Sequence, residues 1–308
     1  MASTDVILVT GCSSGIGLEL ARLLRNTTFR VVLTARTSSL ATLAKEGFAD
    51  SERMIIRPLD VGNAREREGL FEEIGWRWGG VDILVNNAGI SYRAVVEHMT
   101  EDEEFHQMQT NYLGPMALTR LALPWMRSNR YGKIISVSSV SGMMAMPTMS
   151  SYSSSKFALE GAMESLWYEL QPWNIAVSLV QPGFIRSDSF LNVYYSRRAA
   201  ACDLQNDEYC RYYTAMEPFI ERLMRLSPTS ARDVAKQILK LIRANSLPLR
   251  KPATWDAQIF YWIRRLLPRR IYHRVLYWSL PSAKHWSKAT NTPHPKPDPR
   301  SHSNDDAI

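Results

Sequence analysis

Cysteine and long apolar runs are both scarce in this chain of 308 residues. No uninterrupted apolar run reaches the about 18 residues that a membrane-spanning helix needs, so we expect no such helix. The opening segment, MASTDVILVT, lacks the basic start and long apolar core of a secretory signal. The three cysteines, Cys12, Cys202 and Cys210, are odd in number and lack metal-ligand spacing. They argue against a disulfide framework and a zinc site and for a reducing compartment, so we expect a cytoplasmic protein without a bound metal.

A charge imbalance is also missing from most of the chain. The formal net charge is +7, yet residues 1–249 hold 26 basic and 26 acidic residues. Residues 250–308 hold 11 basic and 4 acidic residues and account for the whole excess. No known nucleic-acid-binding motif accompanies this charge, so we expect no nucleic-acid partner.

Six short apolar runs alternate with stretches long enough to form helices. Such β-branched runs are typical of strands buried on both faces, and helices between them allow parallel crossovers. The pattern predicts an α/β fold, a single Rossmann-type doubly wound parallel sheet with helices on both faces. Ligands bind such sheets at the carboxyl ends of the strands. The runs are Val6–Thr10, Arg30–Thr34, Met54–Leu59, Val81–Asn86, Lys133–Val137 and Ile175–Val180.

The domain organisation follows from where this alternation stops. Residues 1–250 are expected to form one Rossmann-fold domain, and the stretch SLPLRKP supplies a further strand. An aromatic-rich insertion at 188–228 shows no clear strand and is expected to form a lid. A basic amphipathic extension follows at 251–290. Residues 291–308 are rich in Pro, Ser, Asn and Asp and are expected to be disordered.

A glycine-rich turn follows the first predicted strand and leads into a helix. Glycines let the backbone turn tightly and approach a pyrophosphate, whose charge the helix N-terminus favours. The spacing differs from the commoner Gly-x-Gly-x-x-Gly fingerprint, so its weight comes from its place in the chain. The residues concerned are Gly11, Ser13, Ser14, Gly15, Ile16 and Gly17.

The end of the second strand indicates which dinucleotide is bound. An NAD site usually places an acidic residue there for the ribose hydroxyls, but this chain has Ala35 followed by Arg36. A guanidinium can face a 2′-phosphate, which a carboxylate would repel. The pattern favours NADP(H) over NAD(H), and a solvated surface arginine is the alternative.

Two further strand ends carry polar groups. Asp60 ends the third run and can accept from an adenine amino group or cap the next helix. The segment VNNAG ends the fourth run and brings Asn87, Ala88 and Gly89 to the same sheet edge. Asn-Asn pairs are usually turn residues, so their position beside the expected cofactor carries the prediction.

Ser139, Tyr152 and Lys156 form the pattern that predicts catalysis. Tyr152 and Lys156 are four residues apart in a helical stretch and therefore share a face. A neighbouring ammonium favours the phenolate and is expected to lower the pKa of Tyr152 from about 10 toward the working range of a base. Ser139 follows the fifth strand and can orient a substrate oxygen. The alternative is an ordinary amphipathic helix with a surface tyrosine and lysine.

The sequence at this point resembles the short-chain dehydrogenase/reductase family over residues 4–250. The matching segments, in family order, are TGCSSGIG, LDV, VNNAG, TNYLG, the Ser139/Tyr152/Lys156 set and VQPGFIRS. The resemblance implies that Asn111 is a fourth catalytic residue, which holds a helix kink and a water serving the lysine. It also implies hydride transfer between a nicotinamide and a carbinol or carbonyl carbon, with Tyr152 as the acid/base.

The resemblance also implies a full cofactor site. Ser187 departs from the family, which usually has threonine there, but keeps a hydroxyl. Tyr152 and Lys156 belong to this set as well as to the catalytic one. The remaining implied contacts are Gly11, Ser13, Ser14, Gly15, Ile16, Gly17, Arg36, Asp60, Val61, Asn87, Ala88, Gly89, Pro182, Gly183 and Ser187.

Within the family, TGCSSGIGLEL and YSSSKFALEGAMESL look most like the branch of 17β-hydroxysteroid and retinol dehydrogenases. Soft methionines before Tyr152 and aromatic residues in the insertion agree with a lipophilic alcohol or carbonyl substrate, such as a steroid or retinoid. The alternative is that they only pack the lid. The family habit implies a homodimer or tetramer. The substrate-binding residues expected are Ser139, Met143, Met144, Met149, Tyr152, Phe184 and Phe190.

The tail segment Ile259–Leu280 mixes aromatic and aliphatic residues with five arginines, and Pro268 divides it into two helical stretches. Such a pattern is typical of a helix lying at a membrane interface. We therefore expect peripheral membrane contact through 255–289. A helix that covers the substrate cleft and one that packs on a partner subunit are the alternatives.

Two functions of other classes compete with the oxidoreductase. The segment GCSSG fits the Gly-x-Ser-x-Gly of a Ser-His-Asp hydrolase, but no earlier strand supplies a second oxyanion donor. The histidines before the tail, His98 and His106, lie in an acidic stretch unlike a catalytic loop. A catalytically silent NADP(H)-binding sensor or scaffold needs only the fold and the cofactor site. The complete Asn111, Ser139, Tyr152 and Lys156 set argues against it.

Overall fold

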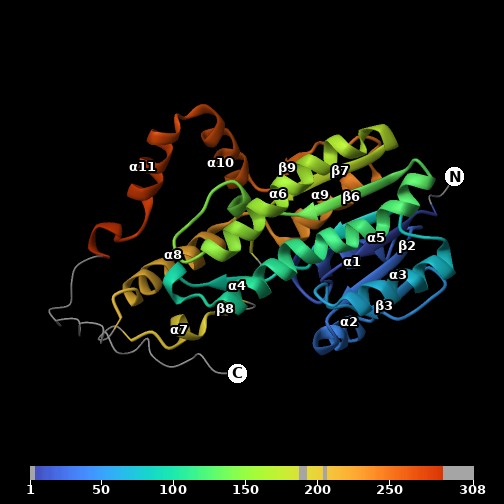
Figure 1. The fold of residues 1–308 in the computed structure, drawn as a ribbon, viewed down its shortest axis with the longest axis horizontal. Helices are drawn as coiled ribbons and strands as arrows, with labels where there is room; N and C mark the ends of the chain where they lie inside the picture. Colours follow the sequence, from blue (N-terminus) through green and yellow to red (C-terminus); the bar gives the residue numbers. More distant parts are fainter. Residues whose placement is uncertain (1–3, 187–192, 204–206, 287–308) are drawn as a thin grey trace, which may run out of the picture.

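A seven-stranded parallel sheet forms the centre of the molecule (Figure 1). The computed structural model describes residues 4–186, 193–203 and 207–286. The strand order is β3-β2-β1-β4-β6-β7-β9, which reverses direction at β1 as in a doubly wound sheet. All six predicted runs form strands, and SLPLRKP supplies β9, so the predicted fold class is confirmed. The strands are β1 Val6–Val9, β2 Arg30–Ala35, β3 Met54–Pro58, β4 Ile83–Asn86, β6 Gly132–Val137, β7 Ile175–Gln181 and β9 Arg250–Pro252.

Helices cover both faces of this sheet. Strand β1 illustrates this, because Ile7 and Val9 pack against α1 and α9 on one face, whereas Val6 and Leu8 pack against α3, α5 and α6 on the other. Since both faces are buried, the strand is apolar at every position. The α-helices are α1 Gly15–Leu24, α2 Leu40–Lys45, α3 Ala64–Trp78, α4 Glu101–Met108, α5 Gly114–Ser128, α6 Ser150–Leu170, α7 Arg197–Ala200, α8 Cys210–Leu226, α9 Ala231–Arg243, α10 Trp255–Leu266 and α11 Arg269–Ser279.

A second, two-stranded sheet joins two distant segments. Strand β5 (Ser91–Arg93) follows the VNNAG segment and pairs in parallel with β8 (Val193–Tyr195). The expectation of no strand in the insertion is therefore wrong at β8. Three residues are too few to show an alternation, and their pairing partner lies far away in the sequence. The insertion also contains α7 and the whole of α8.

The cysteines depart from the expectation. Cys202 and Cys210 are joined by a disulfide, whereas Cys12 is free and buried. An odd count leaves room for one pair, and the Cα atoms of these two cysteines lie 5.6 Å apart, within the range that a disulfide can bridge. The cysteine count therefore no longer supports a reducing compartment.

The C-terminal extension forms two helices, α10 and α11, separated at Pro268 as expected. Figure 1 shows them together at one end of the molecule, beyond α6. Within the described residues, no helix combines the length and the apolar character needed to cross a bilayer. The segment 291–308, expected to be disordered, lies outside the described residues.

Candidate active site

A cavity of about 560 Å³ lies at the carboxyl end of the sheet. Most of the residues predicted to bind cofactor or substrate line it. Gly17, Asn111, Met143 and Met144 are not among its lining residues, and Ser187 and Phe190 lie outside the described part of the chain. The predicted residues that line it are Gly11, Ser13, Ser14, Gly15, Ile16, Arg36, Asp60, Val61, Asn87, Ala88, Gly89, Ser139, Met149, Tyr152, Lys156, Pro182, Gly183 and Phe184.

The glycine turn packs tightly against the VNNAG loop. Gly11 has a φ of +70°, and a Cβ added there would lie 2.8 Å from the Cα of Ala88. The side chain of Asn87 donates to the carbonyls of Thr10 and Gly11 at 2.9 and 3.0 Å. A Cβ on Gly17 would lie 2.2 Å from the Gly11 carbonyl oxygen. Gly17 thus lets the first turn of α1 pack against the backbone of Gly11. A glycine-rich turn at a helix N-terminus leaves room for a bound pyrophosphate.

Arg36 stands at the end of β2 on the rim of the cavity. Its guanidinium donates a hydrogen bond of 3.0 Å to the Tyr194 hydroxyl of β8. It therefore lies on the cavity side instead of pointing only into solvent. Asp60 also lines the cavity, and its carboxylate accepts from the N–H of Gly62 at 2.8 Å. The following helix is capped by Asn63 and not by Asp60.

Ser139 and Tyr152 meet inside the cavity. Burial raises the pKa of Tyr152, while its hydrogen bond with Ser139 and the positive charge of Arg93 act to lower it. Lys156 was expected to lower this pKa, but its Nζ lies 5.8 Å from the Tyr152 ring centroid and donates to the carbonyl of Val137 at 2.9 Å. That expectation is wrong, because the lysine faces strand β6 and Arg93 is the cation that acts on the phenol.

Lys156 is itself perturbed. Burial lowers its pKa to about 8, and the charge of Glu160 acts in the opposite direction. Only 5% of its surface is exposed. A buried ammonium with a pKa near neutrality can give up and regain a proton under working conditions.

Asn111 lies in a π-helical turn, η3 (Gln109–Leu113), between α4 and α5. Its side-chain nitrogen donates to the Ile90 carbonyl at 2.9 Å and to Ser155 Oγ at 3.0 Å, and its oxygen accepts from the Ile90 N–H. A Cβ on Gly89 would lie 3.3 Å from the Asn111 oxygen and 3.7 Å from Lys156 Nζ. Asn111 and Lys156 therefore flank the same glycine, and the irregular turn implied by the resemblance is present.

Apolar side chains form the other end of the cavity, where Met146, Met149, Phe184, Ile220 and Met224 gather. Residues of α8 thus contribute to the wall.

Met143 and Met144 lie elsewhere. They are buried against Tyr272 and other apolar residues of α10 and α11, so the structure does not bring them to the cavity. The cavity lining includes Val140 and Ser141 of η4 (Val140–Gly142), whereas the two methionines that follow η4 pack against the C-terminal extension.

The C-terminal extension supports the site from outside. The Thr254 hydroxyl accepts from the N–H of Gly183 at 2.9 Å, and the Asp256 carboxylate accepts from the N–H of Phe184 at 2.8 Å. A Cβ on Gly183 would lie 2.0 Å from that carboxylate. The extension therefore contacts the turn after β7, and its helices pack on Met143 and Met144, which lie outside the cavity lining.

Arg93 is the main residue that the sequence analysis missed. It lies on β5, lines the cavity and acts electrostatically on Tyr152. A basic residue four positions after the VNNAG segment was the available signal. Its meaning depends on β5, whose three residues carry too little pattern to be predicted.

Comparison with known proteins identifies the family of the chain. Residues 5–196 match the family model described as short chain dehydrogenase. A 3-ketodihydrosphingosine reductase from Bacteroides thetaiotaomicron is 34% identical over 246 residues, which cover 80% of this chain and 86% of the relative.

Solved structures agree as well. A short-chain dehydrogenase from Streptomyces avermitilis has a TM-score of 0.74 and 29% identity, covering 90% of this chain and 97% of its own. A variant of actinorhodin polyketide ketoreductase, solved with NADPH, has a TM-score of 0.66 and 28% identity, covering 82% and 98%. The sheet order agrees with these matches, and the chain belongs to the short-chain dehydrogenase family of oxidoreductases.

Proposed function

We propose that the protein is an NADP(H)-dependent oxidoreductase that interconverts an alcohol and its carbonyl on a lipophilic substrate. The observation that carries the proposal is that Ser139, Tyr152 and Lys156 line one cavity together with the glycine turn and a group of apolar side chains. The relative named 3-ketodihydrosphingosine reductase supports a ketone substrate with a long apolar part.

The polar end fits a dinucleotide. The tight glycine turn, the amides after β4 and the carboxylate of Asp60 lie around one face of the cavity. Arg36 faces the same space and supports a preference for the 2′-phosphate of NADP(H), as does the ketoreductase neighbour solved with NADPH. When bound, the nicotinamide supplies or accepts the hydride.

The protein's own groups handle the oxygen and the proton. Ser139 Oγ accepts from the N–H of Ser141 at 3.1 Å, which leaves its own proton for a substrate oxygen. Tyr152 donates a second hydrogen bond and transfers its proton to the developing alkoxide during reduction. The raised pKa keeps the phenol protonated near neutral pH, ready for this step. Lys156 and Asn111, which flank Gly89, serve the relay that restores this proton, and the pKa of about 8 for Lys156 lies close to the working pH.

We also propose that α10 and α11 touch a membrane through their outer face. This face exposes large apolar residues among arginines, a composition that suits an anionic lipid surface. The same helices pack on Met143 and Met144 with their inner face, so the two contacts are compatible. A homodimer or tetramer stays a prediction, which light scattering would test. The exposed apolar residues are Trp262, Leu266, Ile271, Val275 and Trp278.

The test of the activity is a screen that follows NADPH absorbance with ketosteroids, retinals, long-chain 3-keto compounds and aromatic carbonyls. Oxidation of NADPH by at least one lipophilic carbonyl, faster than with NADH, is expected. NADPH binding without turnover across the whole panel would contradict the oxidoreductase and favour a cofactor-binding sensor.

A further inference from the structure

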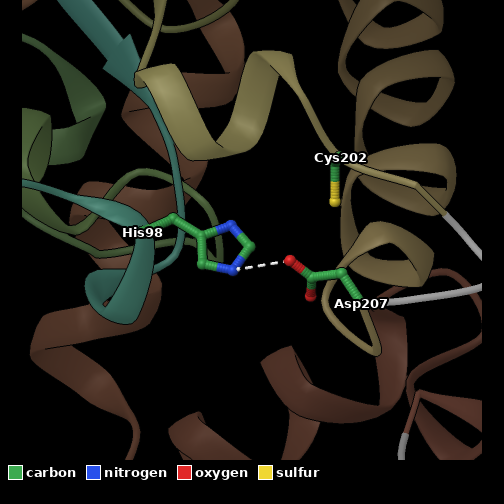
Figure 2. Close-up of side chains that lie close together, drawn as sticks. All are labelled: His98, Cys202 and Asp207. Carbon is green, nitrogen blue, oxygen red and sulfur yellow. Dashed lines mark ion pairs between the residues drawn. The ribbon is translucent and has the colours of Figure 1, made fainter. Parts of the chain in front are cut away.

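Three metal-ligating side chains converge outside the active site. They are His98, in the turn η2 (Val96–His98) after β5, and Cys202 and Asp207 in the insertion. Their ligand atoms all lie within 4.8 Å of one another. In Figure 2 the imidazole points at the Asp207 carboxylate, and the sulfur of Cys202 is directed toward the same space.

His98 is oriented by its neighbours. Only 1% of it is exposed, and its Nδ1 lies 2.9 Å from the hydroxyl of Tyr213, which also accepts from the N–H of Val95. Its Nε2 lies 3.0 Å from an Asp207 oxygen, yet among the described residues it has no hydrogen-bond partner of adequate geometry. A buried imidazole nitrogen is therefore aimed at the cluster by its partner on the other side of the ring, as metal-binding histidines usually are.

The sulfur of Cys202 cannot bind a metal as a thiolate while it forms a disulfide. Cys202 is bonded to Cys210 in the structure, and Cys210 is 2% exposed at the first residue of α8. A dithiol reductant would cleave this bond, passing two electrons and two protons to the two sulfurs and becoming a disulfide itself. The Cys202 thiol would then stand beside His98 and Asp207, with the Cys210 thiol next to it, because the two sulfurs start from bonded contact.

We propose that, once the Cys202–Cys210 disulfide is reduced, His98, Cys202, Asp207 and Cys210 bind one Zn²⁺ ion. Imidazole, thiolate and carboxylate are the ligands zinc prefers, at about 2.0–2.3 Å in a tetrahedron. The 3.0 Å between the imidazole nitrogen and the carboxylate oxygen is close to an edge of such a tetrahedron. Each thiol releases its proton to solvent as it becomes a ligand.

The two states would hold the insertion differently. The disulfide closes a short loop within the insertion, with a separation of eight residues. The zinc ion would instead cross-link that loop to His98, five residues after Arg93, which lines the active-site cavity. The redox state would thus decide whether the insertion is covalently closed on itself or tied through a metal to the segment beside the active site.

The experiment uses the full chain, once oxidised and once reduced with a phosphine and desalted without oxygen. Each form is mixed with Zn²⁺, passed through a gel-filtration column and analysed for metal. We expect about one zinc per reduced chain and none on the oxidised chain. In the reduced form, Co²⁺ should give the thiolate charge-transfer band and the visible bands of a tetrahedral site.

Variants separate the site from incidental binding. Cys202→Ser should remove the thiolate band or weaken it strongly, and Asp207→Asn should weaken zinc binding at least about tenfold. Cys12→Ser is the matched control and should bind like the parent, because Cys12 lies in the core beside β1. Circular dichroism verifies that each variant is folded. A metal-free reduced chain, equal binding by the oxidised chain, or a Cys202→Ser variant that binds zinc like the parent would each overturn the proposal.

Discussion

The carboxylate of Asp256, in the first turn of α10, accepts a 2.8 Å hydrogen bond from the backbone N–H of Phe184. The C-terminal extension thereby holds the turn that follows β7, and it is this turn that lines the cavity. Only 8% of Asp256 is exposed. Its loss would leave a poorly solvated N–H at the site, which ordinarily costs about 1–3 kcal/mol.

Asp256→Ala should therefore lower the free energy of unfolding by about 1–3 kcal/mol and raise the KM for NADPH. Asp256→Asn keeps an acceptor oxygen and should be milder in both respects. Urea unfolding and steady-state kinetics measure the two effects. Equal behaviour of the alanine and asparagine variants would show that this hydrogen bond does not support the turn.

Tyr152→Phe should reduce turnover by at least about 100-fold, because it removes the proton donor and keeps the ring. NADPH binding, followed by fluorescence, should change only slightly. Tyr168→Phe on the same helix is the control, since Tyr168 is exposed and should retain full activity. A Tyr152→Phe variant with more than a few per cent of activity would exclude the phenol as the acid/base.

Arg36→Ser should lower kcat/KM with NADPH by about 10- to 100-fold and leave the value with NADH nearly unchanged, because one charged hydrogen-bond donor to the 2′-phosphate is lost. Arg36 also bonds to Tyr194. Tyr194→Phe removes that bond alone and serves as the control. If both variants change the NADPH-to-NADH ratio equally, the effect comes from the contact with β8 and not from the phosphate.

The depressed pKa of Lys156 predicts a specific pH dependence of stability. The unfolded chain, with a lysine pKa of about 10.4, binds more protons than the folded chain above the folded value of about 8. Stability should therefore rise with pH between about 8 and 10.4 through this group. Lys156→Met should lack this rise, so the difference between parent and variant in urea unfolding isolates it from the tyrosines. A constant difference across that window would contradict the burial of a charged lysine.

Replacement of Trp262, Leu266 and Trp278 by Ser should reduce co-sedimentation with anionic vesicles, because it removes the apolar part of the outer face of α10 and α11. Trp76→Ser is the matched control, since Trp76 is an exposed tryptophan on α3. Unchanged partitioning of the triple variant would exclude this face as the membrane contact. Neutral vesicles show how much of the binding depends on the arginines.

The sheet and much of the site were predictable because their determinants are local. A buried parallel strand needs a continuous apolar run, and each predicted run supplied one. The spacing of Tyr152 and Lys156 places both on one helix face regardless of what surrounds that helix. The glycine turn is likewise predictable, because consecutive residues form it. These features depend on neighbours within a few positions, so the sequence alone determined the fold class and the spacing of the proposed catalytic residues.

Other features depended on contacts between distant segments. Arg93 acts on Tyr152 because the segment of β5 packs against α6, and the neighbouring Ala94 forms a β-bridge with Met149, more than fifty residues later. Met143 and Met144, which were predicted to bind substrate, instead pack against α10 and α11. Only the tertiary structure decided which cation acts on the phenol, how the cysteines pair and where the C-terminal helices pack. The physical reason is that these outcomes follow from packing and electrostatics across space, for which a single sequence carries no local pattern.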